Sequence, residues 1–177
     1  MAKTANWLTD DEQALWRLML AAGGKVTRTI DDALQSNANL SSSEFAVMVT
    51  LSEAEDHQCR LRDLCSTLSW DRSRASHLVT RMEKRGLVTK GPCPDDARGV
   101  LITLTDDGMQ RLIEAAPDHV EVVRRLVFDG LEVVSVDGIK QFLTNILETD
   151  TSDLLARDCP ACDEVEAEIA GELNTGK

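Results

Sequence analysis

Residues 67–88 of this 177-residue chain, TLSWDRSRASHLVTRMEKRGLV, decide the fold. Four apolar residues recur in this stretch at the spacing of one α-helical stripe: Ala75, Leu78, Val79 and Met82. Asp71 is suited to cap the first turn of such a helix, and Gly86 is suited to the left-handed conformation that ends one. We therefore predict a helix from about residue 72 to residue 85, with one side facing a core.

The opposite side of this helix carries hydroxyl, imidazole and guanidinium or ammonium groups, which suit phosphates and base edges. The outward residues are Arg72, Ser73, Arg74, Ser76, His77, Thr80, Arg81 and Lys84. An ordinary solvated helix would look similar if this segment stood alone. The flanking segments therefore have to distinguish the two interpretations.

Those flanking segments favour a winged helix-turn-helix. Upstream, residues 61–68 carry a second apolar stripe on a short helix, and residues 69–70 leave room for a tight turn. Downstream, a strand begins at Leu87, residues 91–99 (GPCPDDARG) form a turn-rich loop, and residues 100–104 alternate as a returning strand. The fold class that this order predicts is mainly α with a small β-hairpin wing.

The segments RSRASHLVTRMEKRGLV (72–88) and DDARGVLITLTDDG (95–108) resemble the MarR family of bacterial transcription regulators, and the resemblance extends over nearly the whole chain. The family's wing pattern falls on Asp96, Arg98, Leu104 and Thr105. The resemblance implies that the helix at 72–85 enters a major groove of double-stranded DNA and that Arg98 reaches into a minor groove. Ala97 stands where many members carry another Arg, which implies weaker wing contacts.

We assign individual roles within this frame. The residues expected to contact base edges are Ser73, Arg74, Ser76 and His77. The residues expected to contact phosphates are Arg72, Thr80, Arg81 and Lys84. These roles predict a sequence-specific transcription regulator that acts as a repressor.

The charge of the chain agrees with this partner once its distribution is considered. The formal net charge is −12, but residues 60–98 hold 9 Lys or Arg and 5 Asp or Glu, a local excess of four positive charges. Phosphate binding needs a local basic patch, and acidic surroundings lower non-specific affinity for nucleic acid. An acidic chain is therefore compatible with DNA binding.

The sequence excludes several other classes of protein. The N-terminus lacks the apolar region of a signal peptide, and no apolar stretch is long enough for a membrane span. Five cysteines, an odd number, favour a reducing compartment over a disulfide framework. We expect a cytoplasmic protein without membrane association.

Enzymatic activity is not expected, and neither is a cofactor. No phosphate loop, metalloprotease motif, nucleophile elbow or dinucleotide fingerprint is present. A thiol enzyme is a remote alternative, because Cys65 points inward on its predicted helix while His77 points outward. A protein-interaction module that has lost DNA binding is a third class.

The domain organisation that we predict has three parts. They are an N-terminal dimerisation helix at 1–38, a winged helix-turn-helix DNA-binding domain at 39–105, and C-terminal dimerisation helices with an acidic tail at 106–177. These flanking helices have more apolar surface than one small domain can cover, which favours a homodimer. Two reading helices related by a twofold axis imply a near-palindromic operator.

Local signals set the starts and weak points of the flanking helices. Capping boxes begin helices at Thr9 and at Ser41, and Thr105 begins a third. Gly23 and the glycine after it interrupt the first helix. The apolar stripe of the third helix resumes beyond Pro117, so this proline is expected to kink that helix without ending it.

Cysteine oxidation is one trigger that would release DNA. We expect Cys93 to be exposed in the wing, and Cys65 to lie on the inward stripe of its helix, where oxidation would disturb packing. Cys159 and Cys162 form a CPAC motif that suits a disulfide, an incidental structural role or half of a zinc site. No second such pair completes four ligands, so no metal is assigned.

A small-molecule effector is the other trigger, and it would make the protein a ligand sensor without a redox role. The residues that could line a mostly apolar pocket are Trp16, Met19, Phe45, Met48 and His57. The alternative is that these residues belong to the core, as Met and aromatic residues at helical spacing usually do.

Overall fold

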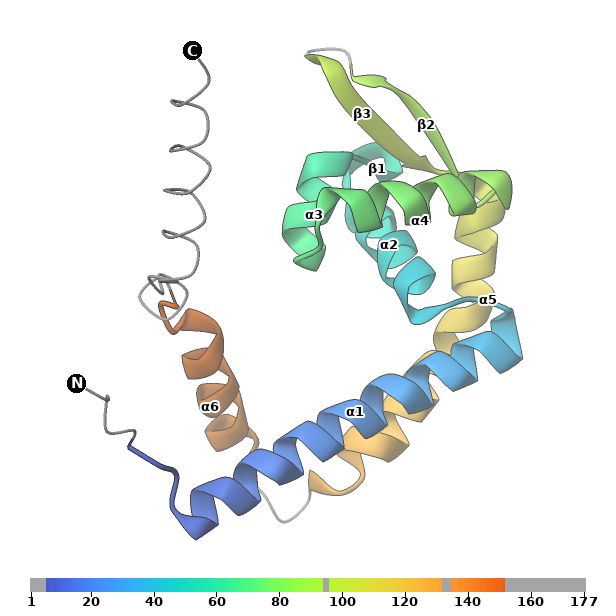
Figure 1. Ribbon diagram of the computed structural model, residues 1–177. Helices are drawn as coiled ribbons and strands as arrows, with labels where there is room; N and C mark the ends of the chain where they lie inside the picture. The colour runs from blue at the N-terminus through green and yellow to red at the C-terminus, as the bar shows by residue number, and fades with distance from the viewer. Residues whose placement is uncertain (1–5, 94–95, 132–134, 152–177) are drawn as a thin grey trace, which may run out of the picture. The chain divides into compact units, whose positions relative to one another are not determined.

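The computed structural model of the chain describes residues 6–93, 96–131 and 135–151, and Figure 1 shows its arrangement. Its elements are α1 (Asp10–Ala38), α2 (Ser42–Glu53), the 3-10 turn η1 (Glu55–His57), β1 (Gln58–Arg60), α3 (Leu61–Leu68), α4 (Arg72–Lys84), β2 (Val88–Cys93), β3 (Asp96–Leu104), α5 (Asp106–Val123), the π-helical turn η2 (Arg124–Phe128) and α6 (Val136–Glu148). The described residues up to Gly130 form one compact unit, and α6 belongs to a second. The predicted winged helix-turn-helix is confirmed.

The predicted helix starts are also confirmed, because each capping residue satisfies backbone N–H groups that the helix leaves free. The Thr9 hydroxyl accepts from the backbone N–H of Glu12 at 3.3 Å, and the Glu12 carboxylate accepts from the backbone N–H of Thr9 at 2.7 Å. Ser41 and Glu44 make the same reciprocal pair at the start of α2. Asp71 accepts from the N–H of Arg74 at 2.8 Å and caps α4.

The two expected weak points do not end their helices. Helix α1 runs without a break through Gly23 and Gly24, and α5 continues through Pro117. Figure 1 shows the first half of α5 near α2 and its second half beside α1. The π-helical turn that follows α5 had no signal in the sequence.

The sheet is larger than the hairpin that the sequence predicted. Its strand order is β1-β3-β2, and both pairs of neighbours are antiparallel. Strand β1 is three residues long and pairs Cys59 with Ile102, which is too short a run for alternation to reveal. The prediction of a loop over 91–99 is wrong, because β2 extends to Cys93 and β3 begins at Asp96.

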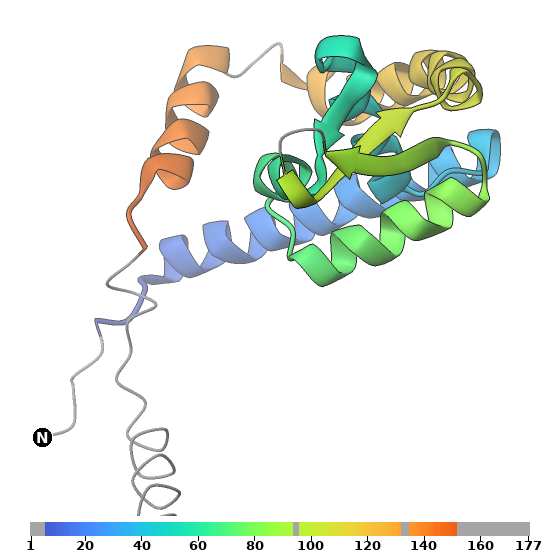
Figure 2. The ribbon, with the colours of Figure 1, turned by 90° about the horizontal axis from the view of Figure 1, so that it is seen from above.

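The core lies between the helices and this sheet. The predicted stripe of α4 is buried: Ala75, Leu78, Val79 and Met82 are each at most 3% exposed. They pack with Met48, Leu51 and Leu64 from α2 and α3 and with Ile102 from β3. Figure 2 shows α4 beside the β2–β3 hairpin. Because one side of α4 is buried in the core, its other side faces solvent.

A partly buried ion pair holds three helix ends together. The Arg85 guanidinium donates to the Glu44 carboxylate at 2.7 Å and to the backbone carbonyl of Asn39 at 2.5 Å. Burial by itself would raise the pKa of Glu44, but hydrogen bonds from Ser41 and Arg85 outweigh burial and lower that pKa. The end of α4 is therefore tied to the end of α1 and to the start of α2.

We expect Arg85→Ala to lower the free energy of unfolding by about 2 kcal/mol, because it leaves the carboxylate of Glu44 buried without its cation. Since the pKa of Glu44 is lowered by folding, the pair stabilises above the ordinary value of 4.5 and this stability is lost as the pH falls below it. Urea unfolding across this pH range measures both effects. Arg62→Ala removes an exposed pair with Asp63 and is the control, with little expected change.

Gly108 lies in the first turn of α5 and closely approaches the backbone of Leu87, which lies between α4 and β2. A Cβ there would overlap the carbonyl oxygen of Leu87 and lie 2.8 Å from the side chain of Leu104. The nearby Thr105 hydroxyl donates to the carbonyl of Gly86 at 2.6 Å and accepts from the N–H of Gly108 at 2.9 Å. This close approach positions α5 against the base of the wing.

Gly108→Ala should therefore destabilise the fold by about 2 kcal/mol, since the backbone of Leu87 would have to move. Gly23→Ala is the matched control, because a Cβ at Gly23 meets no atom within 4 Å in the middle of α1. That change should stabilise the fold by about 0.5–1 kcal/mol. Thermal and urea unfolding measure both variants, and two shifts of the same sign would contradict a special role for the close approach at Gly108.

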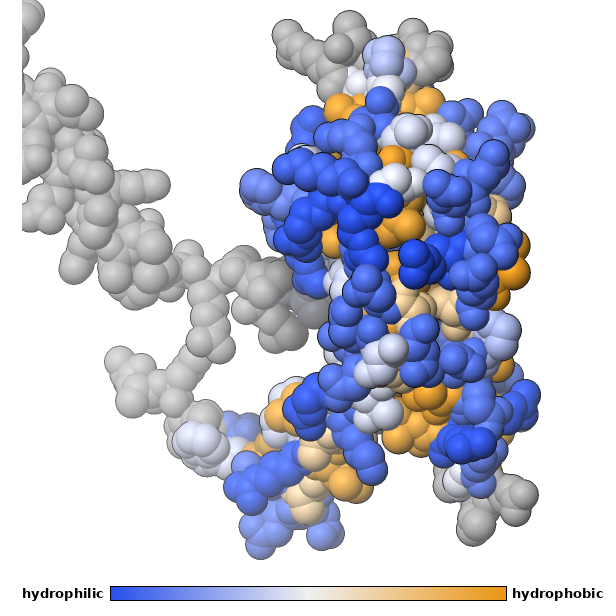
Figure 3. Space-filling view, turned by 90° about the vertical axis from the view of Figure 1, so that its right-hand side faces the viewer, coloured by the Kyte–Doolittle hydropathy of each residue, from blue (hydrophilic) through white to orange (hydrophobic). Residues whose placement is uncertain are grey.

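Several large apolar side chains stay exposed. In the first unit they are Trp7, Leu8, Leu15, Trp16, Leu18, Leu20, Ile113, Val120, Val127 and Phe128. In α6 they are Val136, Phe142, Leu143, Ile146 and Leu147. Figure 3 shows hydrophobic side chains, in orange, reaching the surface among hydrophilic ones on one face.

Candidate nucleic-acid interface

The outward side of α4 is the candidate interface. Seven predicted contact residues on it are exposed: Arg72, Ser73, Arg74, Ser76, His77, Arg81 and Lys84. They all lie between the Asp71 cap and the end of α4 at Lys84. The structure therefore presents the hydroxyls, the imidazole and the cations on one helix surface, as the sequence predicted.

Thr80 differs from these residues because its hydroxyl is already engaged. It donates to the Ser76 carbonyl at 2.8 Å and accepts from the Lys90 ammonium at 3.2 Å. Lys90 also pairs with Glu83 at 2.8 Å. The contribution of Lys90, which ties β2 to α4, was not predicted, since an isolated lysine on a strand gives no signal for a contact between elements.

The wing carries the remaining predicted contact. The backbone of Arg98 lies in β3, two residues after its start at Asp96, while its side chain lies outside what the structure describes. The assignment of Arg98 to a minor groove stays a prediction.

Trp70 and Arg74 form a contact that was not predicted from the sequence. The Cζ of Arg74 lies over the Trp70 ring, 4.7 Å from its centroid. Trp70 occupies the turn between α3 and α4 and is half-buried against the core. The only signal in the sequence was the spacing of four positions between an aromatic residue and an arginine. A turn followed by a helix can bring two such side chains together.

Cys93 is not placed as expected. Cys93 is only 5% exposed, so the expectation of an exposed wing thiol is wrong. The residue lies in β2 and not in a loop, and the ladder shifts register between Pro92 and Cys93. Its side chain lines a cavity of about 460 Å³ together with Cys59 and Leu101.

The other cysteines give a mixed picture. Cys65 is half-buried and packs against the core, in agreement with its predicted inward position. Cys59, which was not expected to take part in redox chemistry, is also half-buried, and burial raises the pKa of its thiol. Cys159 and Cys162 lie outside the described residues. Within the described part of the chain, no group of three or more His, Cys, Asp or Glu is placed to hold a metal ion.

The five residues suggested for an effector pocket have different surroundings. Phe45 and Met48 belong to the core, Met19 is half-buried, and Trp16 is 49% exposed. His57 is exposed, with Nδ1 3.1 Å from the Ser52 carbonyl oxygen. The core alternative thus holds for the two residues of α2.

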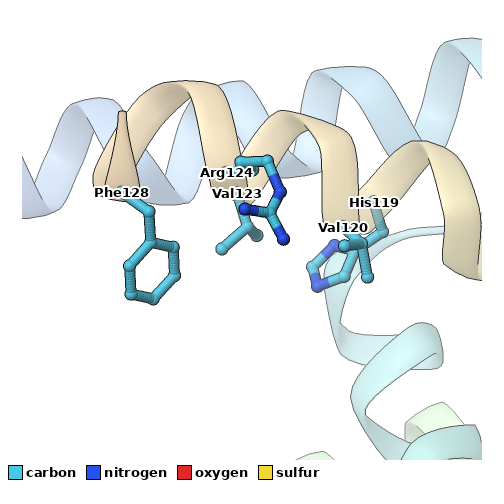
Figure 4. Close-up of a pocket in the computed structure, with 5 residues that line it drawn as sticks. All are labelled: His119, Val120, Val123, Arg124 and Phe128. Atoms are coloured by element: carbon cyan, nitrogen blue, oxygen red, sulfur yellow. The ribbon is translucent and has the colours of Figure 1, made fainter. Parts of the chain in front are cut away.

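A groove of about 450 Å³ is lined instead by His119, Val120, Val123, Arg124 and Phe128. Figure 4 shows these side chains along α5 and the turn that follows it. The imidazole of His119 contacts the Phe45 ring, with centroids 4.5 Å apart, and its Nδ1 is buried without a hydrogen-bond partner among the described residues. Burial lowers the pKa of His119, which favours the neutral ring.

Comparisons with known proteins agree with this geometry. Residues 40–100 match the family model described as MarR family. The crystal structure of Sco3205, a MarR family transcriptional regulator from Streptomyces coelicolor in complex with DNA, is similar with 32% identity and a TM-score of 0.80, covering 87% of this chain and 97% of that one.

Two further proteins extend the comparison. AbsC, a MarR family transcriptional regulator from Streptomyces coelicolor, is 29% identical with a TM-score of 0.73, covering 92% of this chain and 99% of that one. The transcriptional repressor MprA of Escherichia coli (strain K12) is 24% identical over 136 residues, 77% of this chain and 76% of that protein. No helix in the described part of the chain is long and apolar enough to cross a membrane.

Proposed function

We propose that this chain, which belongs to the MarR family of transcription regulators, represses transcription as a homodimer bound to a near-palindromic operator in double-stranded DNA. The observation that carries the proposal is the exposed surface of α4, whose opposite side is wholly buried. The complex of Sco3205 with DNA supports the partner, and the function of MprA as a repressor supports the direction of control. Family membership agrees with the expectation that the chain is not an enzyme.

Two kinds of contact are assigned to this surface. Exposed Ser73, Arg74, Ser76 and His77 are proposed for base edges. Exposed Arg72, Arg81 and Lys84 are proposed for phosphates, together with the half-buried Thr80. The hydroxyl of Thr80 would keep its bond to Ser76 while Lys90 beside it adds positive charge.

We expect Arg81→Ala to weaken binding to every duplex alike and to reduce the slope of log affinity against log salt by about one unit, because one phosphate contact is lost. His77→Ala should instead relax the preference among base pairs. The measurement is a titration of selected and scrambled duplexes at several salt concentrations. Gln110→Ala, on the exposed side of α5, is the control. An unchanged salt slope for Arg81→Ala would contradict the phosphate role.

The homodimer proposal rests on the exposed apolar residues. In the first unit, Leu18 is 66% exposed on α1 and Phe128 is 55% exposed at the end of η2. In α6, Phe142 and Leu147 are exposed as well. Large apolar surfaces of this kind are typical of interfaces, and a second copy offers a matching apolar surface. A dimer also supplies the second reading helix that a palindromic operator requires.

The double variant Leu18→Glu/Phe128→Glu should shift the protein towards monomers, because it places charge in the proposed interface, and should weaken operator binding at least about tenfold. Sedimentation velocity measures the first effect and a DNA titration the second. Gln110→Glu adds a charge to an exposed polar site and should leave both unchanged. Dimers of unaltered stability in the double variant would contradict this interface.

Release of DNA is proposed to follow binding of a small, mostly apolar molecule in the groove along α5. Val120, Val123 and Phe128 supply the apolar wall, while His119 and Arg124 supply polar groups. The ligand must prefer the conformation that does not fit DNA. Thiol oxidation at the half-buried Cys65 is the alternative trigger, and the burial of Cys93 removes one of the reasons for it.

We expect a thermal-shift screen with aromatic acids, lipids and antibiotics to find a compound that stabilises the protein and lowers its affinity for DNA. His119→Ala should abolish both effects. Cys65→Ser should leave both intact, and treatment with mild peroxide should leave DNA affinity unchanged. A blank screen combined with peroxide release that Cys65→Ser prevents would replace the effector by the redox trigger.

A further inference from the structure

The turn between α3 and α4 places an aromatic ring under the first turn of the reading helix. Trp70 follows Ser69, which has the left-handed φ of 53° and ends α3. The N–H of Trp70 donates to the carbonyl of Cys65 at 2.9 Å. The Trp70 ring is half-buried and packs against the core, so both its backbone and its side chain are held.

Arg74 lies in the first turn of α4, and two contacts hold it in place. Its backbone N–H donates to the Asp71 carboxylate that caps α4, and its Cζ lies over the Trp70 ring at 4.7 Å from the centroid. A guanidinium over an aromatic face is attracted by the negative charge of that face. The guanidinium carries five N–H donors, so a contact with one aromatic ring is compatible with hydrogen bonds from its other N–H groups.

We propose that Trp70 is a positioning residue that holds Arg74 ready to read one guanine in the major groove. Arginine pairs with O6 and N7 of guanine through two N–H groups, a geometry that requires the guanidinium plane to be correctly oriented. The inference rests on the proposed function, because it assigns a specific base to one contact of that interface.

The physical reason is the conformational freedom of arginine. A free Arg side chain samples many rotamers, and ordering it on DNA reduces the affinity gained from the contact. The contact with Trp70 orders the side chain before DNA is bound, so less freedom is lost on binding. His77 also lies on the exposed side of α4 and serves as the matched comparison.

The experiment begins with selection of duplexes from random sequence by the full-length protein. The best duplex and its single-base-pair variants are then titrated with the wild type, Trp70→Leu, Trp70→Phe, Arg74→Ala and the two doubles Trp70→Leu/Arg74→Ala and Trp70→Leu/His77→Ala. Trp70→Phe keeps an aromatic ring at this position and is the variant to use if the turn does not fold in Trp70→Leu. Circular dichroism checks the folding of each variant.

We expect Arg74→Ala to abolish preference at one G·C pair in each half-site. Trp70→Leu should reduce the preference at that same pair about fivefold, in keeping with a cation–π contact, and Trp70→Phe should have a smaller effect. Trp70→Leu should add nothing to the loss of preference in Arg74→Ala, whereas its effect should be additive with that of His77→Ala.

A purely structural role for Trp70 predicts another result. Trp70→Leu would then weaken binding to all duplexes by the same factor. Its effects would also be additive with those of Arg74→Ala. Either outcome overturns the inference. If the protein selects no duplex at all, the proposed function fails together with this inference. If it selects a duplex whose preferences do not respond to Trp70, the inference alone fails.

Discussion

Burial of one side of α4 is the constraint on which the rest of this structure depends. Ala75, Leu78, Val79 and Met82 lie in the core, and an α-helix that buries one stripe must turn the opposite stripe to water. The residues left outside are cations, hydroxyls and an imidazole, which a duplex can bind and a protein core cannot hold without partners. Hydrophobic burial thus orients the surface that we propose to bind DNA.

Polar contacts then fix the angle at which α4 is presented. The Arg85–Glu44 pair ties its end to α1 and α2, and the contact of Lys90 with Glu83 ties its outer edge to β2. Trp70 supports its first turn at Arg74. These contacts join the end of α4 to α1 and α2, its outer edge to β2 and its first turn to the turn after α3.

Sequence reasoning succeeded where the information is local. The caps at Thr9, Ser41 and Asp71 use a side chain and a backbone group three residues apart, and the stripe of α4 repeats within a few turns. It failed where partners are distant in sequence. Strand β1 exists because Cys59 pairs with Ile102, and Cys93 is buried because β2 continues against β3 beyond the expected start of the loop.

The sequence by itself determined where α1, α2, α4 and α5 begin and which side of α4 faces the core, because hydrophobic periodicity and capping act between neighbours along the chain. It also determined the chemistry of the exposed side of α4, since every outward residue of that helix follows from the position of the buried stripe. Only the tertiary structure decided which side chains meet across elements. The ion pair of Glu44 with Arg85 and the contact of Phe45 with His119 depend on distances between helices, which are set by packing in three dimensions and leave no periodic signal in the chain.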